Sequence, residues 1–520
     1  MRKYWIISFI GIFVLLPAMA MGQIRKDSQE KKASLEEYKK KKTEEIKDFR
    51  NKKHKQVDNY RLKKWTEFEN YRTRKNLELI KYMSERWIEV PLEKPLPAPK
   101  LPDPINPPVV PKDDQSRKKP IEIPYGDIIP PTIPKETKPK KQIPPVPEEI
   151  VQPQLDRSKI NLFGTICDIA LNNAKKIELK DVSEKNVARA WGILNKEEAY
   201  KQIIADCINL KEDMHLNGWA MMNLCHKIAI QIQGKESDES TLIHAFLMNQ
   251  MCYDVYLCKI NDKKLAPIYT SDVELCQISR FKSGAKIYNI WGKVVNYSKI
   301  FVFEKLNNVE EVEPINFGNV SYIIFDTKQG SPKSFTSLFN SRMSVTVSIN
   351  ESLMNYYNSL PLINDWSFYA RQPMYPSVKE QVLPSLKRAI EGESEIDAAN
   401  DIIHFVQSAF KYEVDSVLFG RERTYYKEEL FYHPASDCED RSVLFSDLIH
   451  QLLGLDIVLL HYPNHLATAV KFKTEIDNGH SVTIEGQKYM ICDPTCRYSD
   501  VGVCHKNYIH QKPIIYRIYK

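Results

Sequence analysis

One pattern fixes the conformation of the first part of the chain. From residue 24 to residue 87 there is no Gly or Pro, and apolar residues recur every 11 positions in two columns. Eleven residues make three helical turns at about 3.67 residues per turn, so both columns stay on one face of a nearly straight helix. The sequence therefore predicts one long helix over residues 24–88. The columns are Leu35, Ile46, Val57, Phe68 and Leu79, and Tyr38, Phe49, Tyr60, Tyr71 and Tyr82.

Two roles are open for this helix. Its stripe can mediate self-association in a coiled coil, or it can pack on the globular part of its own chain. Residues 24–87 carry 21 Lys and Arg against 12 Asp and Glu, so the net charge of +7 is concentrated here. Basic runs such as 39–42 are typical of a solvated helix face, and we expect no nucleic-acid partner.

The next segment is rich in proline. Residues 91–153 hold 19 of the 31 prolines, interspersed with Lys and Glu. Such a composition favours extended, semi-rigid chain and disfavours a packed core. We therefore interpret residues 89–155 as a proline-rich linker that spaces the helix from the body.

The first 22 residues have the features of a signal peptide. Arg2 and Lys3 precede a short apolar core from Trp5 to Leu16, and Ala18 and Ala20 fit a cleavage site. The apolar run is too short for a comfortable membrane span. The sequence thus predicts an exported protein, periplasmic or secreted, without a stable transmembrane segment after cleavage.

Residues 156–520 are long enough for two domains, and a faint repeat relates their halves. At an offset of 202 residues, two helix-then-strand patterns align, and most aligned positions keep their apolar character. Four positions are identical, namely those of Ser240, Leu242, Asp254 and Leu257. We predict an α+β domain over 156–348 and a related one over 349–520. Four strands, at 286–291, 299–303, 320–325 and 343–348, are expected in a sheet region of the first domain.

The strongest chemical signal lies in the second domain. Cys438, His465 and Asp493 follow one another at spacings of 27 and 28 residues. An apolar helical pattern begins just after Cys438 and is expected to stop at Gly454. Either Ser436 or Asp437 can cap it, so the thiol would lie on the first helical turn, where the thiolate is favoured.

His465 and Asp493 belong to strands in the same region. His465 opens an apolar strand, and Asp493 ends another at Asp-Pro-Thr. A thiol at a helix start, a strand histidine and a carboxylate on the neighbouring strand form the nucleophile, base and orienting group of an acyl-transfer site. Among the other histidines, His461 lies between apolar strand residues and is interpreted as structural. Gln407 can donate to an oxyanion or face solvent, and the backbone N–H of Cys438 is the better oxyanion donor.

At these residues the chain resembles the transglutaminase-like superfamily, which has the papain-like cysteine fold. The resemblance covers about residues 395–500. It rests on three motifs: Asp-Cys-Glu-Asp-Arg, His-x-Ala-x-Ala-Val and Tyr-x-x-x-Asp-Pro-Thr. It implies a nucleophilic Cys438, a basic His465 and an orienting Asp493. The superfamily includes cross-linking enzymes, peptidases, deamidases and inactive members. Because Glu236 stands where the repeat would place the cysteine, the 156–348 domain would be a degenerate copy of this fold.

The expected function is therefore acyl transfer or hydrolysis at a peptide or side-chain amide of a protein or peptide substrate. The alternative is a catalytically silent assembly protein that uses the scaffold and the 24–88 helix. No cofactor and no metal site is expected from the His and Cys spacings. Ten cysteines leave disulfides among Cys492, Cys496 and Cys504, or buried thiols, as open alternatives.

Overall fold

The structure is a computed structural model, and it covers most of the chain. It describes residues 24–99, 106–111, 120–131, 143–147, 150, 156–171, 173–292, 298–309, 312–318, 322–326 and 328–519, with side chains from residue 38 onward. The chain forms two compact units, Met1–Thr66 and Glu67–Lys520. The expected signal peptide, residues 1–22, lies outside the described residues.

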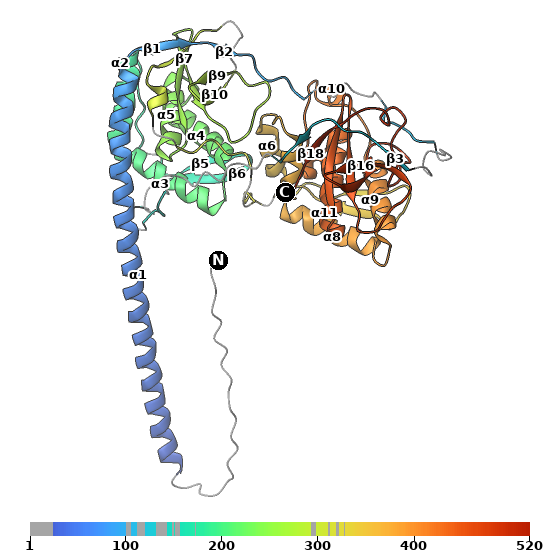
Figure 1. Cartoon of the computed structure of the whole chain (residues 1–520). Helices are drawn as coiled ribbons and strands as arrows, with labels where there is room; N and C mark the ends of the chain where they lie inside the picture. Colours follow the sequence, from blue (N-terminus) through green and yellow to red (C-terminus); the bar gives the residue numbers. More distant parts are fainter. Residues whose placement is uncertain are drawn as a thin grey trace. The chain divides into compact units, whose positions relative to one another are not determined.

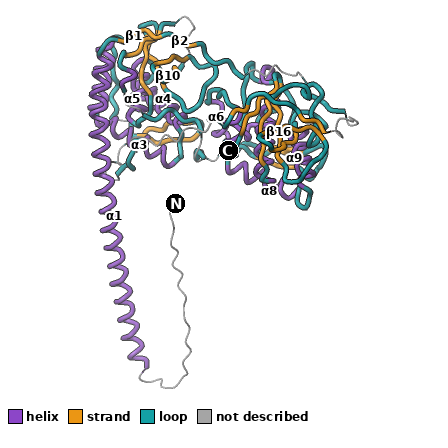
Figure 2. Tube along the Cα trace, viewed as in Figure 1, coloured by secondary structure: helices purple, strands orange, loops and turns teal. Residues whose placement is uncertain are grey.

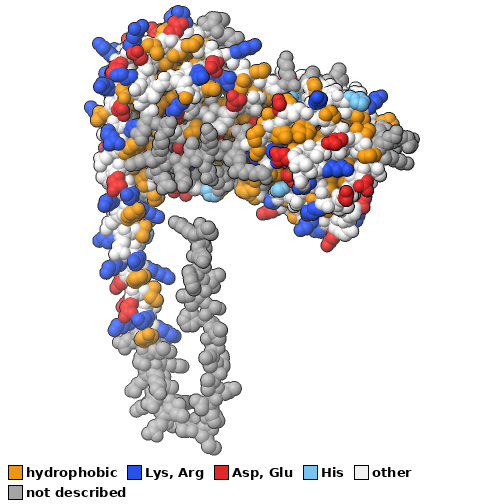
Figure 3. Space-filling model, in the orientation of Figure 1, with side chains coloured by type: hydrophobic (Ala, Val, Ile, Leu, Met, Phe, Trp, Pro, Cys, Tyr) orange, Lys and Arg blue, Asp and Glu red, His pale blue; other side chains and the backbone are white. Residues whose placement is uncertain are grey.

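The predicted N-terminal helix is confirmed. Helix α1 (Ile24–Ser84) is continuous and ends four residues before the predicted boundary. In the first unit its stripe is exposed: Phe49 and Tyr60 are each 62% exposed and Ile46 is 52% exposed. Figure 3 shows hydrophobic side chains along this helix among Lys and Arg. Among the described residues, no helix has the length and apolar character that crossing a bilayer requires.

The end of α1 that belongs to the second unit is packed. Phe68 and Leu79 are buried, and Asn76 donates hydrogen bonds to Gln250 Oε1 (2.8 Å) and Asn195 Oδ1 (2.6 Å). Trp191 Nε1 in turn donates to Asn76 Oδ1 at 2.9 Å. Of the two roles left open by the sequence, packing on the chain's own body therefore holds for this end of the helix.

The body, residues 156–519, is an α+β structure, as predicted. Its first part contains β5 (Ser158–Leu162), β6 (Thr165–Ile169), α2 (Glu184–Lys196), α3 (Glu198–Asp213), α4 (Gly218–Gln233), α5 (Asp238–Gln250), β7 (Val255–Ile260), β8 (Lys264–Tyr269), β9 (Arg280–Ser283), β10 (Lys286–Ile290), β11 (Ile300–Phe303), η2 (Leu306–Asn308), β12 (Lys333–Thr336) and β13 (Ser344–Val347). Its second part contains α6 (Glu351–Ser359), α7 (Trp366–Arg371), α8 (Pro376–Ala389), α9 (Glu395–Ala409), α10 (Asp415–Leu418), η3 (Lys427–Phe431), α11 (Cys438–Leu453), β14 (Asp456–Tyr462), β15 (His465–Lys471), β16 (Gly479–Ile484), β17 (Gln487–Cys492) and β18 (Ile514–Arg517).

The proline-rich segment is more than a spacer. Its described parts include β1 (Trp87–Val90) and β2 (Leu92–Glu93), which are the two edge strands of one seven-stranded sheet. They also include β3 (Pro120–Glu122) and β4 (Ile128–Ile129), the two edges of a second seven-stranded sheet. A proline is tolerated at the start of an edge strand, where its missing N–H costs no ladder hydrogen bond. The interpretation as a linker without packing is therefore wrong for these strands.

The two sheets have the same strand order. One runs β2-β9-β10-β8-β7-β11-β1, and the other runs β3-β16-β17-β15-β14-β18-β4. Figure 2 shows the strands in orange. In each, the five central strands lie in the order third, fourth, second, first, fifth along the chain, and all four pairings are antiparallel. Only the flanking strands differ, because β1 and β2 pair antiparallel whereas β3 and β4 pair parallel. This shared topology supports the internal repeat inferred from the sequence.

A helix leads into each set of central strands. Helix α5 begins after the capping residue Ser237 and helix α11 begins after Asp437. Figure 1 shows α5 beside the strands of its sheet and α11 beside those of the other. Helix α11 ends at Gly454, whose positive φ of 65° is the left-handed conformation that favours glycine. The prediction that Gly454 stops this helix is confirmed.

Two strand predictions need correction. Residues 322–325 are not a strand, and residues 320–321 lie outside the described part of the chain. The expected strand at 343–348 exists as β13, but it pairs with β12 in a separate two-stranded ribbon. Phe335 of this ribbon packs against Phe410 and Phe431, so the ribbon belongs with the helices of the second half.

Candidate active site

The histidine and the aspartate of the predicted triad are in contact. His465 is the first residue of β15, and Asp493 follows the last residue of β17, its neighbour in the sheet. The Nε2 atom of His465 lies 2.8 Å from Oδ2 of Asp493, and both side chains are buried. This contact leaves the Nδ1 atom of His465, which has no hydrogen-bond partner, as the nitrogen that can act as a base.

Asp493 is held in its ionised form. Its Oδ1 atom accepts hydrogen bonds from the backbone N–H groups of Thr495 and Cys496, each at 3.0 Å. Burial alone would raise the pKa of Asp493, but His465 and these two N–H groups bring the pKa below its ordinary value. A carboxylate fixed in this way can hold the imidazole in a single orientation.

The cysteine lies beside the same strand. Cys438 is the first residue of α11, and the backbone N–H of Leu466, next to His465, donates to its sulfur. One turn later, Ser442 Oγ donates to the carbonyl of Leu466 at 2.9 Å, which ties the helix to β15. The expected position at the helix start, with Asp437 as the cap, is therefore correct.

The thiol makes no hydrogen bond with the imidazole. The Sγ atom of Cys438 instead donates to Oε2 of the adjacent Glu439 at 3.3 Å. Burial raises the pKa of Cys438 well above its ordinary value, and the charges of Glu439 and Asp437 raise it further. The expectation that the helix start would favour the thiolate is thus wrong for this conformation, because burial and the two acidic neighbours outweigh the helix dipole.

The site is also closed to solvent. Cys438 is 2% exposed, His465 is fully buried and Asp493 is 2% exposed. Tyr508 stacks on the imidazole of His465, with ring centroids 4.8 Å apart and planes 13° apart, and packs against Tyr462 at 5.0 Å. The sequence reasoning missed Tyr508, which lies in a loop without strand or helix periodicity. Because the three side chains are buried, a substrate can reach the sulfur only after surrounding residues move.

Two other predicted residues are structural. His461 packs edge-on against Trp366 at 4.5 Å, and burial lowers its pKa to about 4. Gln407 is buried, so neither a solvent-facing nor an oxyanion role fits it. Its Nε2 atom donates to the carbonyls of Asp493 and Ser499, both at 3.0 Å. Gln407 therefore supports the loop that carries the triad aspartate.

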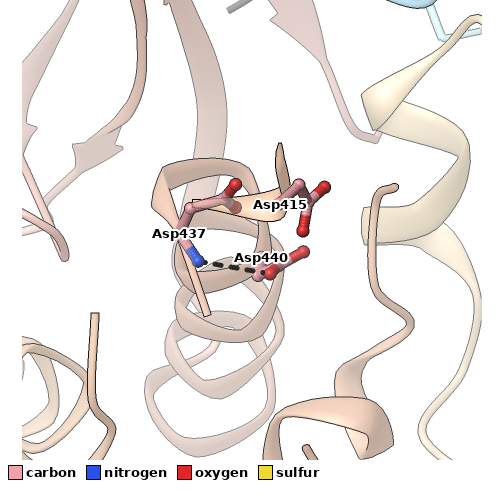
Figure 4. A group of neighbouring side chains, drawn as sticks. All are labelled: Asp415, Asp437 and Asp440. Atoms are coloured by element: carbon pink, nitrogen blue, oxygen red, sulfur yellow. Dashed lines mark hydrogen bonds between the residues drawn. The ribbon is translucent and has the colours of Figure 1, made fainter. Parts of the chain in front are cut away.

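Buried carboxylates surround the start of α11. Figure 4 shows Asp415, from α10, facing Asp437 and Asp440. The Oδ1 atom of Asp440 accepts from the backbone N–H of Tyr425 at 2.8 Å, and its Oδ2 atom accepts from the N–H of Asp437 at 3.3 Å. Burial and the neighbouring Asp440 raise the pKa of Asp415 to about 9. Within the described part of the chain, Arg441 forms no ion pair with Glu439 or Asp440.

The guanidinium of Arg441 is engaged elsewhere. It donates to the carbonyl of Phe410 at 2.9 Å and, at longer distance, to the carbonyl of Gln407 and to Ser436 Oγ. It therefore fixes the segment before the cysteine rather than neutralising the carboxylates. Cys492 and Cys504, which were candidates for a disulfide, are buried free thiols.

The corresponding positions of the first sheet carry different chemistry. Lys264 opens β8 opposite Ile260, as His465 opens β15 opposite Tyr462. Ile290 pairs with Ile268 in the first sheet, as Ile491 pairs with Ala469 in the second. Gly292 follows Ile290 by two residues, as Asp493 follows Ile491, so Gly292 stands at the position of Asp493. Cys438 is the first residue of α11, whereas Asp238 is the first residue of α5 and Glu236 lies before its capping residue Ser237. The expected match of Glu236 with Cys438 is therefore shifted by two residues, and the first copy has none of the three triad residues.

No protein family model, no curated protein and no solved structure matches this chain.

Proposed function

We propose that the second half of the body is a transglutaminase-like cysteine enzyme that transfers or hydrolyses the acyl group of a peptide or side-chain amide. One observation carries the proposal: His465 and Asp493 form a buried 2.8 Å contact at the end of neighbouring strands, beside the helix that begins with Cys438. Nucleophile, base and orienting group come from three separate segments, and each has the residue type that its role requires.

The proposed reaction proceeds in two steps. His465 Nδ1 takes the proton of the Cys438 thiol, and the sulfur attacks the amide carbon. The C–N bond then breaks as His465 returns the proton to the leaving amine, which leaves a thioester on Cys438. Water gives hydrolysis and a primary amine gives transamidation, and either regenerates the thiol. Asp493 holds the imidazole and stabilises its protonated form during both steps.

The closed conformation requires one adjustment before this chemistry. Cys438 Sγ must turn from Glu439 toward Nδ1 of His465, which has no other partner. Catalytic hydrogen bonds are often long or misaligned in the absence of substrate and tighten only in the complex. We therefore expect substrate binding to move the residues around the site and to bring the sulfur and the imidazole together.

The test compares the full chain with Cys438→Ala. Both proteins are incubated under reducing conditions with a peptide library and a labelled primary amine, and cleavage and amine incorporation are scored by mass spectrometry. We expect activity only with Cys438 present, together with a thioester intermediate on that residue. Cys504→Ala, which removes another buried thiol, serves as the matched control and should remain active. Equal results for wild type and Cys438→Ala would exclude the proposed enzyme.

A second candidate is a catalytically silent assembly protein. The observation that favours it is the first copy, which keeps the strand order of the second with none of the triad residues. For such a protein, the exposed stripe of α1, which includes Ile46 and Phe49, would be the interaction surface. For this candidate, Cys438→Ala would leave every property of the protein unchanged, whereas charged substitutions on the stripe would alter its self-association in light scattering.

A further inference from the structure

The exposed part of α1 carries cations on the same face as its apolar stripe. Lys42, Lys53 and Lys64 recur every 11 residues, in step with the two apolar columns. Each of them lies four residues after a member of the column that contains Tyr38 and four residues before a member of the column that contains Ile46. Residues four apart are neighbours on a helix surface, so a row of lysines runs between the two columns.

These lysines contact the aromatic rings beside them. Their Nζ atoms lie near the ring of the residue four positions earlier, at 6.0 Å from its centroid for Lys42, 5.8 Å for Lys53 and 5.9 Å for Lys64. A cation within about 6 Å of an aromatic centroid is attracted to the ring. Lys42 also pairs with Glu45 at 2.7 Å, but both side chains are about half exposed, and such a surface pair adds little stability. The ammonium groups and the rings therefore lie together on one face.

A second row of cations lies beyond the column that contains Ile46. Lys39, Arg50 and Arg61 each follow a member of this column by four residues. Between residues 38 and 64, neither the two rows nor the two columns contain Asp or Glu, and the segment as a whole holds 12 Lys and Arg against four Asp and Glu. Figure 3 shows Lys and Arg side chains beside hydrophobic ones along this part of α1. We call these two columns and two rows, over residues 38–64, the cationic face of α1.

We propose that the cationic face binds the surface of an anionic lipid bilayer, with α1 lying in the plane of the headgroups. Lys and Arg attract anionic headgroups, and aromatic side chains favour the boundary between headgroups and acyl chains. The long stems of Lys and Arg let the apolar residues between them reach this boundary while the charged groups stay among the headgroups. Because the columns keep one angle along a nearly straight helix, all its turns over about 40 Å can touch a flat surface together.

Two other partners fit this face less well. In a coiled coil, the row of Lys42, Lys53 and Lys64 would lie in the seam between the helices, where buried like charges are unfavourable. A nucleic acid would match the charge, but its phosphate backbone offers no apolar partner for Ile46 and Val57. A bilayer surface matches both the cations and the apolar side chains.

The contact is expected to be superficial. The other faces of α1 also carry charged residues, such as Glu44, Lys47 and Asp48, so the helix cannot sink into the acyl chains. Further along α1, Phe68 and Leu79 are buried, which ends the available face near residue 64. This inference does not depend on the proposed acyl transfer, since an inactive protein with the same helix would bind the bilayer equally well.

The test measures binding of the full chain to lipid vesicles by flotation. We expect binding to vesicles that contain phosphatidylglycerol to be at least about tenfold stronger than binding to pure phosphatidylcholine, and to be lost in high salt. A triple variant with Lys42→Gln, Lys53→Gln and Lys64→Gln removes one row of the cationic face. It should weaken binding to the anionic vesicles at least about tenfold.

The matched control is a triple variant with Lys41→Gln, Lys52→Gln and Lys63→Gln. It removes the same charge from positions one residue earlier, which lie about 100° around the helix, and should bind within about threefold of wild type. The substituted lysines of both variants are exposed or partly exposed, so the helix should form in each, which circular dichroism verifies. Both variants keep the apolar segment 5–16, so any lipid contact of that segment affects them equally.

Several results would overturn the proposal. Equal losses in the two triple variants would mean that only the net charge of α1 matters and that the cationic face has no special role. Binding to duplex DNA without binding to anionic vesicles would identify a nucleic acid as the partner. A doubled mass in light scattering without vesicle binding would identify a second copy of the chain. A wild type that binds neither vesicle would exclude a lipid partner outright.

Discussion

The two sheets of the body share one strand order and differ in what they carry. In the second sheet, His465 and Asp493 occupy the ends of β15 and β17, while the same positions in the first sheet hold Lys264 and Gly292. Both sheets keep a helix ahead of their first central strand and edge strands from the proline-rich segment. The difference shows that this strand order can form without the triad residues, and the predictions below test whether they serve the proposed reaction in the second copy.

The largest expected effect is the difference in acyl-transfer rate between a substitution in the triad and the corresponding substitution in the first copy. His465→Ala removes the proposed base and should reduce the acyl-transfer rate at least about 10³-fold, because the triad works as a unit. Lys264→Ala changes the corresponding position of the first copy and should leave the rate within about twofold of wild type. Steady-state kinetics with the substrate found for the wild type measures both. A comparable loss in Lys264→Ala would mean that the first copy takes part in catalysis and that the comparison is misconceived.

The next effect concerns the edge strands that the linker provides to the second sheet. Ile123 follows β3 and is completely buried in the core of this sheet, whereas Ile121 within β3 is only partly buried. Ile123→Ala should lower the free energy of unfolding by about 2–4 kcal/mol, and Ile121→Ala by less than about 1 kcal/mol. Urea denaturation of the two variants provides the measurement. Equal, small effects would restore the interpretation of this segment as a spacer.

The same reasoning predicts the outcome of a truncation that removes the helix and the proline-rich segment. A chain that begins at residue 156 would lack the packed end of α1 together with β1, β2, β3 and β4. The composition alone predicts that this fragment stays folded, but loss of all four edge strands and of Asn76 should make it aggregate. Light scattering on the purified fragment distinguishes the two outcomes.

A smaller effect tests the role of Tyr508 in the second copy, since the first copy has no catalytic counterpart. Tyr508→Leu removes the ring that stacks on His465, and should change kcat/KM about tenfold and shift its pH profile. Tyr508→Phe keeps the stacking ring and should remain near wild type. A purely structural tyrosine would lower Tm in Tyr508→Leu without moving the pH profile of the remaining activity.

The smallest effect concerns His461, which lies in the same hairpin as His465. Burial lowers the pKa of His461 to about 4, so the unfolded chain binds a proton at a higher pH than the folded chain does. Stability contributed by neutral His461 is therefore present above the ordinary histidine pKa and is lost as the pH falls from about 6.5 to about 4. His461→Phe should reduce the fall in Tm over this range. An identical pH dependence in the variant would show that other groups cause it.

Local patterns carried the sequence predictions that held. The uninterrupted 11-residue columns specified α1, and the cap at Asp437 and the stop at Gly454 bracketed α11 because both depend on neighbouring residues only. The positions of His465 and Asp493 at strand ends predicted their contact, because neighbouring strand ends bring such residues to one edge of a sheet.

Features that depend on distant residues escaped the sequence reasoning. Strands β3 and β4 are two or three residues long and contain or adjoin proline, so they show no alternation. Their pairing is decided by partners more than 350 residues away. The raised pKa of Cys438 and the approach of Asp415 likewise result from burial that only the folded chain creates.

The pairing of these edge strands also dictates when the fold can be completed. Strand β3, near residue 120, can pair only after β16 is available, and β4 can pair only after β18 is available. Strand β18 ends three residues before the end of the printed sequence. Pairings between such distant segments carry a large loop-closure entropy and form slowly. The second sheet therefore cannot close until β18 has emerged, and its early strands remain open to incorrect partners until then. Deletion of the last few residues would thus impair folding more than deletions of similar length within the exposed part of α1.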